Sequence, residues 1–170
     1  TEINGEAKGL VDLIVELNDL AAANGVGRID MVENRLVGIK SRELYEAPAA
    51  MLLIRAHQEL ETMALDREMM HFKPMLTEKF AELIYNGLWY SPLREAISAF
   101  FAKANEVVSG KIKLRLYKGN VTVIGRECPT SLYDMALATY DEGDLFDHTA
   151  AEGFIKIFGL PSKVIARKQK

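Results

Sequence analysis

The sequence lacks the features that several classes of protein require. It has one cysteine, Cys128, among 170 residues, which excludes an internal disulfide and favours a reducing, cytoplasmic setting. The three histidines, His57, His71 and His148, are isolated, and no CxxC or HExxH pair occurs, so we expect no metal site. No apolar run approaches the roughly 20 residues that cross a bilayer. The polar start, Thr1 to Asn4, does not resemble a signal peptide.

Basic residues are also not in excess. The formal net charge is −3, whereas a nucleic-acid-binding domain usually carries a strong positive excess. We therefore expect neither nucleic acid nor membrane as a partner. The remaining composition, 49% hydrophobic and 26% charged, is that of an ordinary globular domain, here with an appended arm. Because the sequence starts without methionine, we expect it to be a piece of a longer protein.

Helical periodicity and its punctuation predict several helices. Apolar residues at spacings of three and four predict one helix from Leu10 that closes at Asn24–Gly25. Pro48 predicts the first turn of a second helix, and an apolar stripe predicts a third that ends near Asn86–Gly87. A fourth helix is expected to start at Ser91 and Pro92 and to stop at Gly110. Ser131 resembles another N-cap.

Two segments read as extended. Residues 25–45 favour strands, with Glu33–Asn34 as the expected turn, although polar and apolar residues alternate imperfectly. Residues 111–127 alternate cleanly around Lys118–Asn120 and predict a hairpin. An acidic loop, Asp141–Asp147, precedes the tail. The fold class we expect is α+β, with a mixed or antiparallel sheet packed against helices and a C-terminal arm.

Two candidate binding sites are weak. The "GVGR" sequence at Gly25–Arg28 lacks the GxGxxG spacing of dinucleotide-binding loops, and no Walker A sequence occurs, so we interpret it as a helix end. The row Lys111, Lys113 and Arg115 could meet an anion or nucleic acid, but we interpret it as a solvated strand face.

The segment "GVGRIDMVENRLVGIKSRELYEAP", Gly25–Pro48, concentrates charges of both signs. A carboxylate such as Glu33, completed by the Tyr45 hydroxyl, could bind the ammonium group of a small zwitterion through charge-assisted hydrogen bonds. A structural ion pair of Arg28 with Asp30 or Glu33 explains the same residues equally well. The residues alone leave both interpretations open.

Several longer sequence segments resemble the argininosuccinate synthase family. They are "GVGRIDMVENRLVGIKSRELYEAPAA", "LDREMMHFKP", "KFAELIYNGLWYSPLREA", "LYKGNVTVIGRECPTSLYD" and "EGFIKIFGLP", in that order. The resemblance runs from about Leu10 to about Lys163 and corresponds to the C-terminal synthetase and multimerisation region. It implies an ATP-dependent, AMP-forming ligase that joins L-citrulline to L-aspartate for arginine biosynthesis.

The resemblance also implies roles for individual residues. Glu33 of the "VEN" motif and Tyr45 of the "YEAP" motif would contact citrulline. No catalytic residue is expected in this sequence. The neighbouring charged and polar residues are expected to fix the shape of this segment without contacting the substrate: Arg28, Asp30, Asn34, Lys40 and Arg42.

The resemblance further implies a domain plan. Residues 1–147 would form the citrulline-binding domain and residues 148–170 an arm that joins subunits of a homotetramer. ATP, with Mg²⁺, and aspartate would bind an N-terminal domain that this sequence lacks, so we expect no cofactor here and no activity from this segment alone. The alternative is a non-catalytic self-association module.

Overall fold

The computed structural model describes residues 2–138 and 147–169, and these divide into two compact units. The first unit ends at Leu132 and the second begins at Tyr133. The sequence predicts a domain boundary at 147/148, after the expected acidic loop. All of that loop except Asp147 lies outside the described residues.

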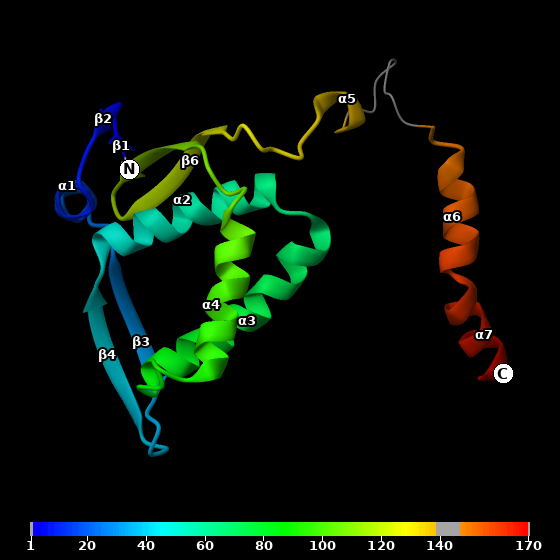
Figure 1. Ribbon diagram of the computed structural model, residues 1–170, viewed down its shortest axis with the longest axis horizontal. Coiled ribbons are helices and arrows are strands. Elements are labelled where there is room, and N and C mark those ends of the chain that lie inside the picture. The colour runs from blue at the N-terminus through cyan, green and yellow to red at the C-terminus, as the bar shows by residue number, and fades with distance from the viewer. Residues whose placement is uncertain (1, 139–146, 170) are drawn as a thin grey trace. The chain divides into compact units, whose positions relative to one another are not determined.

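The described strands of the first unit form three antiparallel pairs (Figure 1). They are β1 (Glu2–Ile3) with β2 (Glu6–Ala7), β3 (Arg28–Asn34) with β4 (Lys40–Glu46), and β5 (Lys111–Tyr117) with β6 (Asn120–Glu127). Together with the helices they confirm the α+β class, as separate two-stranded sheets.

Three helices of the first unit begin where the sequence predicts, and the helix expected to end near Asn86–Gly87 begins at Arg67. The helices of this unit are α1 (Leu10–Ala23), α2 (Pro48–Ala64), α3 (Arg67–Tyr85) and α4 (Pro92–Asn105). Pro48 and Pro92 occupy first-turn positions, where a missing N–H is harmless, and the Ser91 side chain accepts from the Arg94 amide. Asn24 and Asn86 end their helices, each followed by a glycine of positive φ.

Three predicted boundaries differ from the structure. The β3–β4 turn spans residues 36–38 with Gly38 at φ 87°, so Glu33 and Asn34 belong to the strand. Helix α4 ends at Asn105, and Gly110 instead allows a close approach, because a Cβ there would lie 2.1 Å from the Glu127 carbonyl oxygen. The short helix α5 (Met135–Ala138) starts after Asp134, whose side chain accepts from the Ala136 amide, and not after Ser131.

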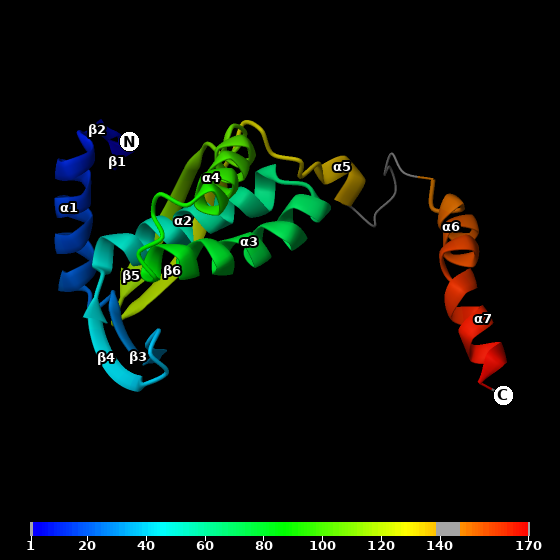
Figure 2. The same cartoon turned by 60° about the horizontal axis from the view of Figure 1, so that its bottom comes forward.

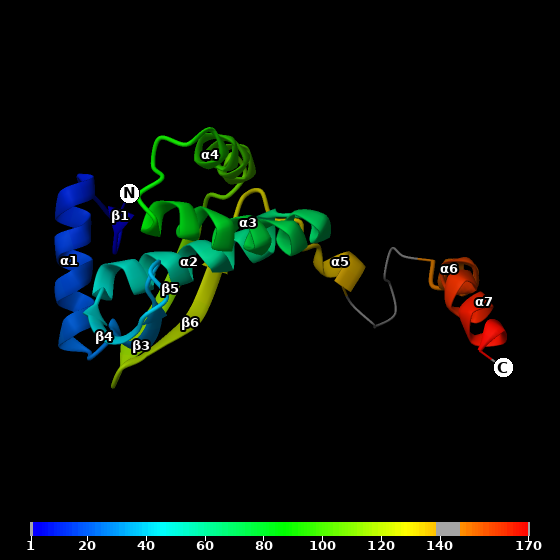
Figure 3. The same cartoon turned by 90° about the horizontal axis from the view of Figure 1, so that it is seen from below.

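The core lies where α1, α2 and the β5–β6 hairpin meet. Ala21, Val26 and Leu52 are buried, and four partly buried side chains pack against them: Leu17, Leu114, Leu116 and Val121. Figure 2 and Figure 3 show α2 crossing beside β5 and β6, with α1 at its N-terminal end. The hairpin turn is tied to the end of α1, since the Gly119 amide donates to the Asn24 carbonyl at 2.7 Å.

The base of the β3–β4 ribbon is locked against the start of α2. The Ala47 amide donates to the Gly27 carbonyl at 2.8 Å. Gly27 has φ 105°, and a Cβ there would lie 2.4 Å from Pro48 Cα. Only glycine allows this approach without displacing backbone. The ribbon therefore leaves the body of the unit at a defined place.

The second unit contains α5, α6 (Ala150–Phe158) and α7 (Leu160–Lys168). The rings of Phe154 and Phe158 stack with centroids 5.2 Å apart. Large apolar side chains of α6 and the start of α7 are exposed: Phe154, Ile155, Ile157, Phe158 and Leu160. Among the described residues no helix is both long and apolar enough to cross a membrane.

Candidate functional site

The β3–β4 ribbon sorts its charged residues onto two faces. In an antiparallel pair, residues directly opposite each other share a face, and successive residues alternate between faces. The register pairs Glu33 with Ser41, Met31 with Glu43, and Ile29 with Tyr45. The acidic and phenolic side chains that the sequence singled out, Glu33 and Tyr45, therefore lie on the same face.

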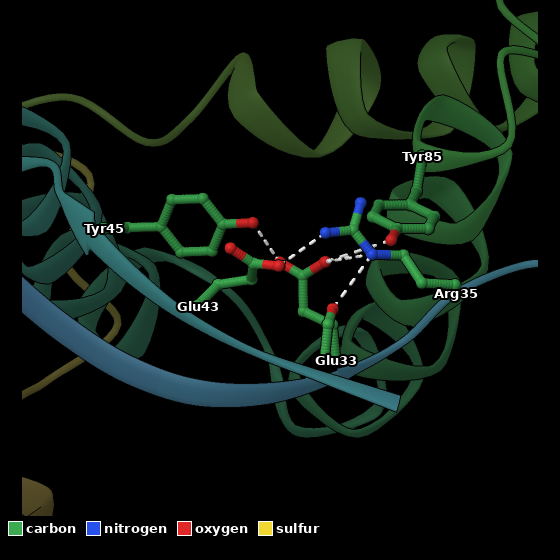
Figure 4. Close-up of polar contacts among 6 residues, drawn as sticks. Glu33, Arg35, Glu43, Tyr45 and Tyr85 are labelled. Atoms are coloured by element: carbon green, nitrogen blue, oxygen red, sulfur yellow. Dashed lines mark hydrogen bonds and ion pairs between the residues drawn. The ribbon is translucent and has the colours of Figure 1, made fainter. Parts of the chain in front are cut away.

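The Glu33 carboxylate is the centre of this face and is 9% exposed. The Tyr45 hydroxyl donates to Glu33 Oε1 from the partner strand. The Tyr85 hydroxyl donates to Glu33 Oε2 at 3.0 Å from the last turn of α3. Figure 4 shows the two phenols approaching the carboxylate from different sides. The structure thus brings the two predicted site residues together and adds a third.

The Arg35 guanidinium points into this cluster and lies between the Glu33 and Glu43 carboxylates (Figure 4). Its Nε donates to Ser41 Oγ at 2.9 Å and its Nη2 donates to Glu43 Oε1 at 2.5 Å. The distance from Arg35 Nε to Glu33 Oε2 is 4.0 Å, at the limit of an ion pair. One guanidinium between two carboxylates leaves the face with a net negative charge, which suits a cationic ligand group.

The hydrogen bonds set the protonation states of the site. The pKa of Glu33 is lowered, mainly because Tyr45 donates to the carboxylate; burial opposes this, while Tyr85 and the charge of Arg35 reinforce it. The same bond raises the pKa of Tyr45 to about 12, and the bond to Glu33 also raises the pKa of Tyr85. At neutral pH the site is a carboxylate held by two neutral phenols.

The residues expected to support the site lie on the opposite face of the ribbon, as the alternation requires. Arg42 holds Asp30 through two bonds, Nε to Oδ1 at 2.8 Å and Nη2 to Oδ2 at 2.6 Å, and this pairing lowers the pKa of Asp30. Lys40 Nζ donates to Asn34 Oδ1 at 2.6 Å. These contacts link the two strands to each other.

Arg28 completes that opposite face. It stands across from Glu46 in the strand register. The ion pairs considered from the sequence, Arg28 with Asp30 or Glu33, are replaced by other partners: Asp30 pairs with Arg42, and Glu33 has Arg35 as its nearest cation.

The weaker candidates have structural roles. Gly25 has φ 73° after the end of α1, as a helix stop requires. His57 Nδ1 lies 3.0 Å from Glu61 Oε1 on the same helix, and no metal-binding cluster of His, Cys, Asp or Glu occurs in ranges 2–138 and 147–169. Lys111, Lys113 and Arg115 are exposed on one face of β5.

Comparison with known proteins shows where this architecture belongs. A family model described as the arginosuccinate synthase C-terminal domain matches residues 1–165. The chain belongs to the argininosuccinate synthase family. A curated argininosuccinate synthase of Symbiobacterium thermophilum is 59% identical over 168 residues, which is 99% of this chain and 42% of that protein.

Other relatives agree with this assignment. The argininosuccinate synthase of Gloeobacter violaceus is 56% identical over 168 residues, covering 99% of this chain and 42% of the relative. That of Oceanobacillus iheyensis is 59% identical over 162 residues, covering 95% and 39%. The chain therefore spans about two fifths of the length of these curated synthases and corresponds to their C-terminal domain.

Within this synthase domain, sequence reasoning missed part of the Glu33 cluster. Arg35, Ser41 and Glu43 share odd numbering with Glu33 and Tyr45, so the alternation would have placed them on this face had the turn been located at residues 36–38. Tyr85 is 52 residues from Glu33, and no local pattern signals that contact.

Proposed function

We propose that this domain supplies the citrulline contacts of an ATP-dependent, AMP-forming ligase that joins L-citrulline to L-aspartate and yields argininosuccinate. Membership of the argininosuccinate synthase family supports the reaction class. The main support for the assignment of the site is the Glu33 carboxylate, which is buried and anionic and accepts a hydrogen bond from a tyrosine hydroxyl at each of its oxygens.

The chemistry of citrulline matches this site at its α-amino end. Its ureido group is neutral, so the α-ammonium is the cationic feature that a carboxylate recognises. An ionised carboxylate has about four lone-pair positions and two are taken by the phenols, which leaves room for an ammonium donor. Charge-assisted bonds of this kind are short and strong.

The contribution to catalysis is orientation. Held at its amino-acid end by Glu33 and Tyr45, citrulline points its ureido oxygen toward the α-phosphate of ATP, where attack displaces pyrophosphate. The aspartate amine then displaces AMP. Fixing two reactants in a reactive geometry lowers the barrier without proton transfer by these side chains. This domain thus binds and positions one substrate.

ATP, its Mg²⁺ and aspartate are assigned to the rest of a full-length synthase. The described residues contain no group of three or more His, Cys, Asp or Glu side chains that could hold a metal ion, and we assign Mg²⁺ to the nucleotide bound by the rest of the synthase. The expected setting is the cytoplasm, in keeping with a single cysteine.

Substitution of Glu33 tests the citrulline assignment. In a full-length synthase carrying this sequence, we expect Glu33→Gln to raise the citrulline KM at least about tenfold, because a charged acceptor is replaced by a neutral amide. The ATP and aspartate KM values should change little. Glu46→Gln, on the opposite face of the same strand pair, is the matched control. An unchanged citrulline KM in Glu33→Gln defeats the assignment.

The activity of the 170-residue chain by itself is a separate test. We propose that it cannot activate citrulline. In an ATP–pyrophosphate exchange assay the chain alone should show no citrulline-dependent exchange, whereas a full-length synthase carrying this sequence should show it. Clear exchange by the chain alone overturns this part of the proposal.

A second function, subunit association, rests on a different observation. Helix α6 exposes Phe154 and Phe158, which stack on each other and are 63% and 74% exposed. Exposed apolar clusters of this kind commonly mark protein–protein contacts. We propose that α6 and α7 form an arm that docks on another copy in a homotetramer. The same arm would join subunits under the alternative function, in which the domain is only a non-catalytic self-association module.

Mass measurement in solution tests the arm. A full-length synthase carrying this sequence but lacking residues 153–170 should have a smaller mass by light scattering than the intact protein. Phe154→Ser with Phe158→Ser should give the same loss without shortening the chain. If both variants keep the mass of the intact assembly, the arm does not hold the subunits together.

A further inference from the structure

The second oxygen of Glu33 has a partner that lies outside the ribbon. Tyr85 is the last residue of α3, and its hydroxyl donates to Glu33 Oε2 at 3.0 Å. The contact joins residues 52 positions apart in the chain. Tyr45, by comparison, reaches the carboxylate from the strand next to Glu33.

The helix end that carries Tyr85 is well anchored. The Asn86 amide donates to the Glu82 carbonyl, and the Leu88 amide donates to the Leu83 carbonyl, both at 2.9 Å. Leu83 is buried, and Gly87 takes a positive φ that turns the chain away from the helix. The Tyr85 hydroxyl is therefore presented from a fixed scaffold.

Two phenols on different oxygens restrict the carboxylate more than one could. The terminal torsion of a glutamate side chain is broad and nearly two-fold, so a single hydrogen bond leaves the carboxylate plane free to rotate. Tyr45 holds Oε1 and Tyr85 holds Oε2, which fixes that plane (Figure 4). The lone pairs that remain then point in set directions.

We propose that Tyr85 is a positioning residue for citrulline, holding the Glu33 carboxylate in the orientation that receives the α-ammonium group. This inference rests on the proposed function. It assigns to α3 a share in a site that otherwise belongs to the β3–β4 ribbon. Tyr85 acts through Glu33. Loss of the Tyr85 hydroxyl therefore leaves Glu33 and Tyr45 able to contact the substrate, but with the Glu33 carboxylate no longer held in the required orientation.

The competing explanation is that Tyr85 only fastens the ribbon to α3. Under that explanation, loss of the hydroxyl lowers stability without altering citrulline recognition. The pH dependence of kcat/KM for citrulline separates the two, because it reports the ionisation of groups in the free enzyme. The titratable and charged groups facing Glu33 are Tyr45, Arg35 and Glu43 from the ribbon and Tyr85 from α3.

Tyr85→Phe in a full-length synthase carrying this sequence is the test. It keeps the ring and removes one donor, which also releases part of the hold on the Glu33 pKa. We expect the citrulline KM to rise about tenfold, with kcat changed by about twofold or less. The acidic limb of kcat/KM should move to higher pH. Tyr90→Phe is the matched control, on a tyrosine that is 88% exposed.

The outcomes are distinct from those of the proposed function. If Glu33→Gln raises the citrulline KM while Tyr85→Phe leaves both KM and the acidic limb as in the parent enzyme, the citrulline site stands and the role of Tyr85 is overturned. A lowered melting temperature alone, with unchanged citrulline kinetics, also overturns it. If Glu33→Gln itself has no effect, the proposed function fails first.

Discussion

Replacing Gly27 by alanine tests how the ribbon is attached to the rest of the domain. Gly27 precedes β3 and has φ 105°, a conformation that L-residues rarely adopt. An added Cβ would lie 2.4 Å from Pro48 Cα and 2.6 Å from Pro48 N. Both are backbone atoms at the start of α2, so no side-chain rotation can relieve the overlap.

The size of the effect follows from two contributions. A strained positive φ costs about 1–3 kcal/mol in a residue other than glycine. Overpacking against backbone that must move costs about 1–3 kcal/mol more. We expect Gly27→Ala to lower the free energy of unfolding by about 2–6 kcal/mol. It should also weaken citrulline binding in the full-length protein, because the base of the ribbon moves.

Gly38→Ala is the matched control for the first contribution. Gly38 has φ 87° in the turn of the same ribbon, and a Cβ there would meet nothing within 4 Å. Urea unfolding, followed by circular dichroism, gives both free energies. Gly27→Ala should be the more destabilising by about 1–3 kcal/mol. Equal losses in the two variants would refute the close approach to Pro48 as the constraint.

Two further predictions concern the protonation and charge of the site. Tyr45 has its pKa raised to about 12, so its neutral hydroxyl contributes stability that is complete below pH 10 and is lost as the pH rises through about 12. Tyrosinate absorbance should show a late ionisation near pH 12, which Tyr45→Phe removes and Glu33→Gln brings back toward 10. A titration without that late step contradicts the bond. Glu43→Gln should release Arg35 to pair with Glu33, which raises the citrulline KM about three- to tenfold. Adding Arg35→Gln should reverse part of that rise. A citrulline KM that stays at the parent value shows that Glu43 does not restrain the Arg35 guanidinium.

Local chemistry made much of the fold predictable. Pro48 and the Ser91–Pro92 pair mark helix starts because they fit the unpaired amides of a first turn. The clean alternation of residues 111–127 marks a hairpin whose inward face packs on α2. The convergence of Glu33 and Tyr45 is one of two interpretations that the residues alone leave open, and the family resemblance favours it over a structural ion pair.

The errors arise where distant contacts override local signals. The β3–β4 ribbon exposes Val32 and Leu44 on one face and buries Glu33 on the other, so hydrophobicity did not indicate its register. Gly110 looked like a helix stop, but it is required by the closeness of the Glu127 carbonyl. Tyr85 meets Glu33 only because the fold brings the end of α3 to the ribbon, which no window of sequence reveals.

The central claim is that Glu33 recognises an ammonium group, and a ligand lacking only that group tests it most directly. 5-Ureidopentanoate is citrulline without its α-amino group. In the parent full-length synthase it should bind at least about tenfold more weakly than citrulline, whereas in Glu33→Gln the two ligands should differ by about twofold or less. If the ratio of their dissociation constants is the same in both proteins, Glu33 does not contact the ammonium group and the account is wrong.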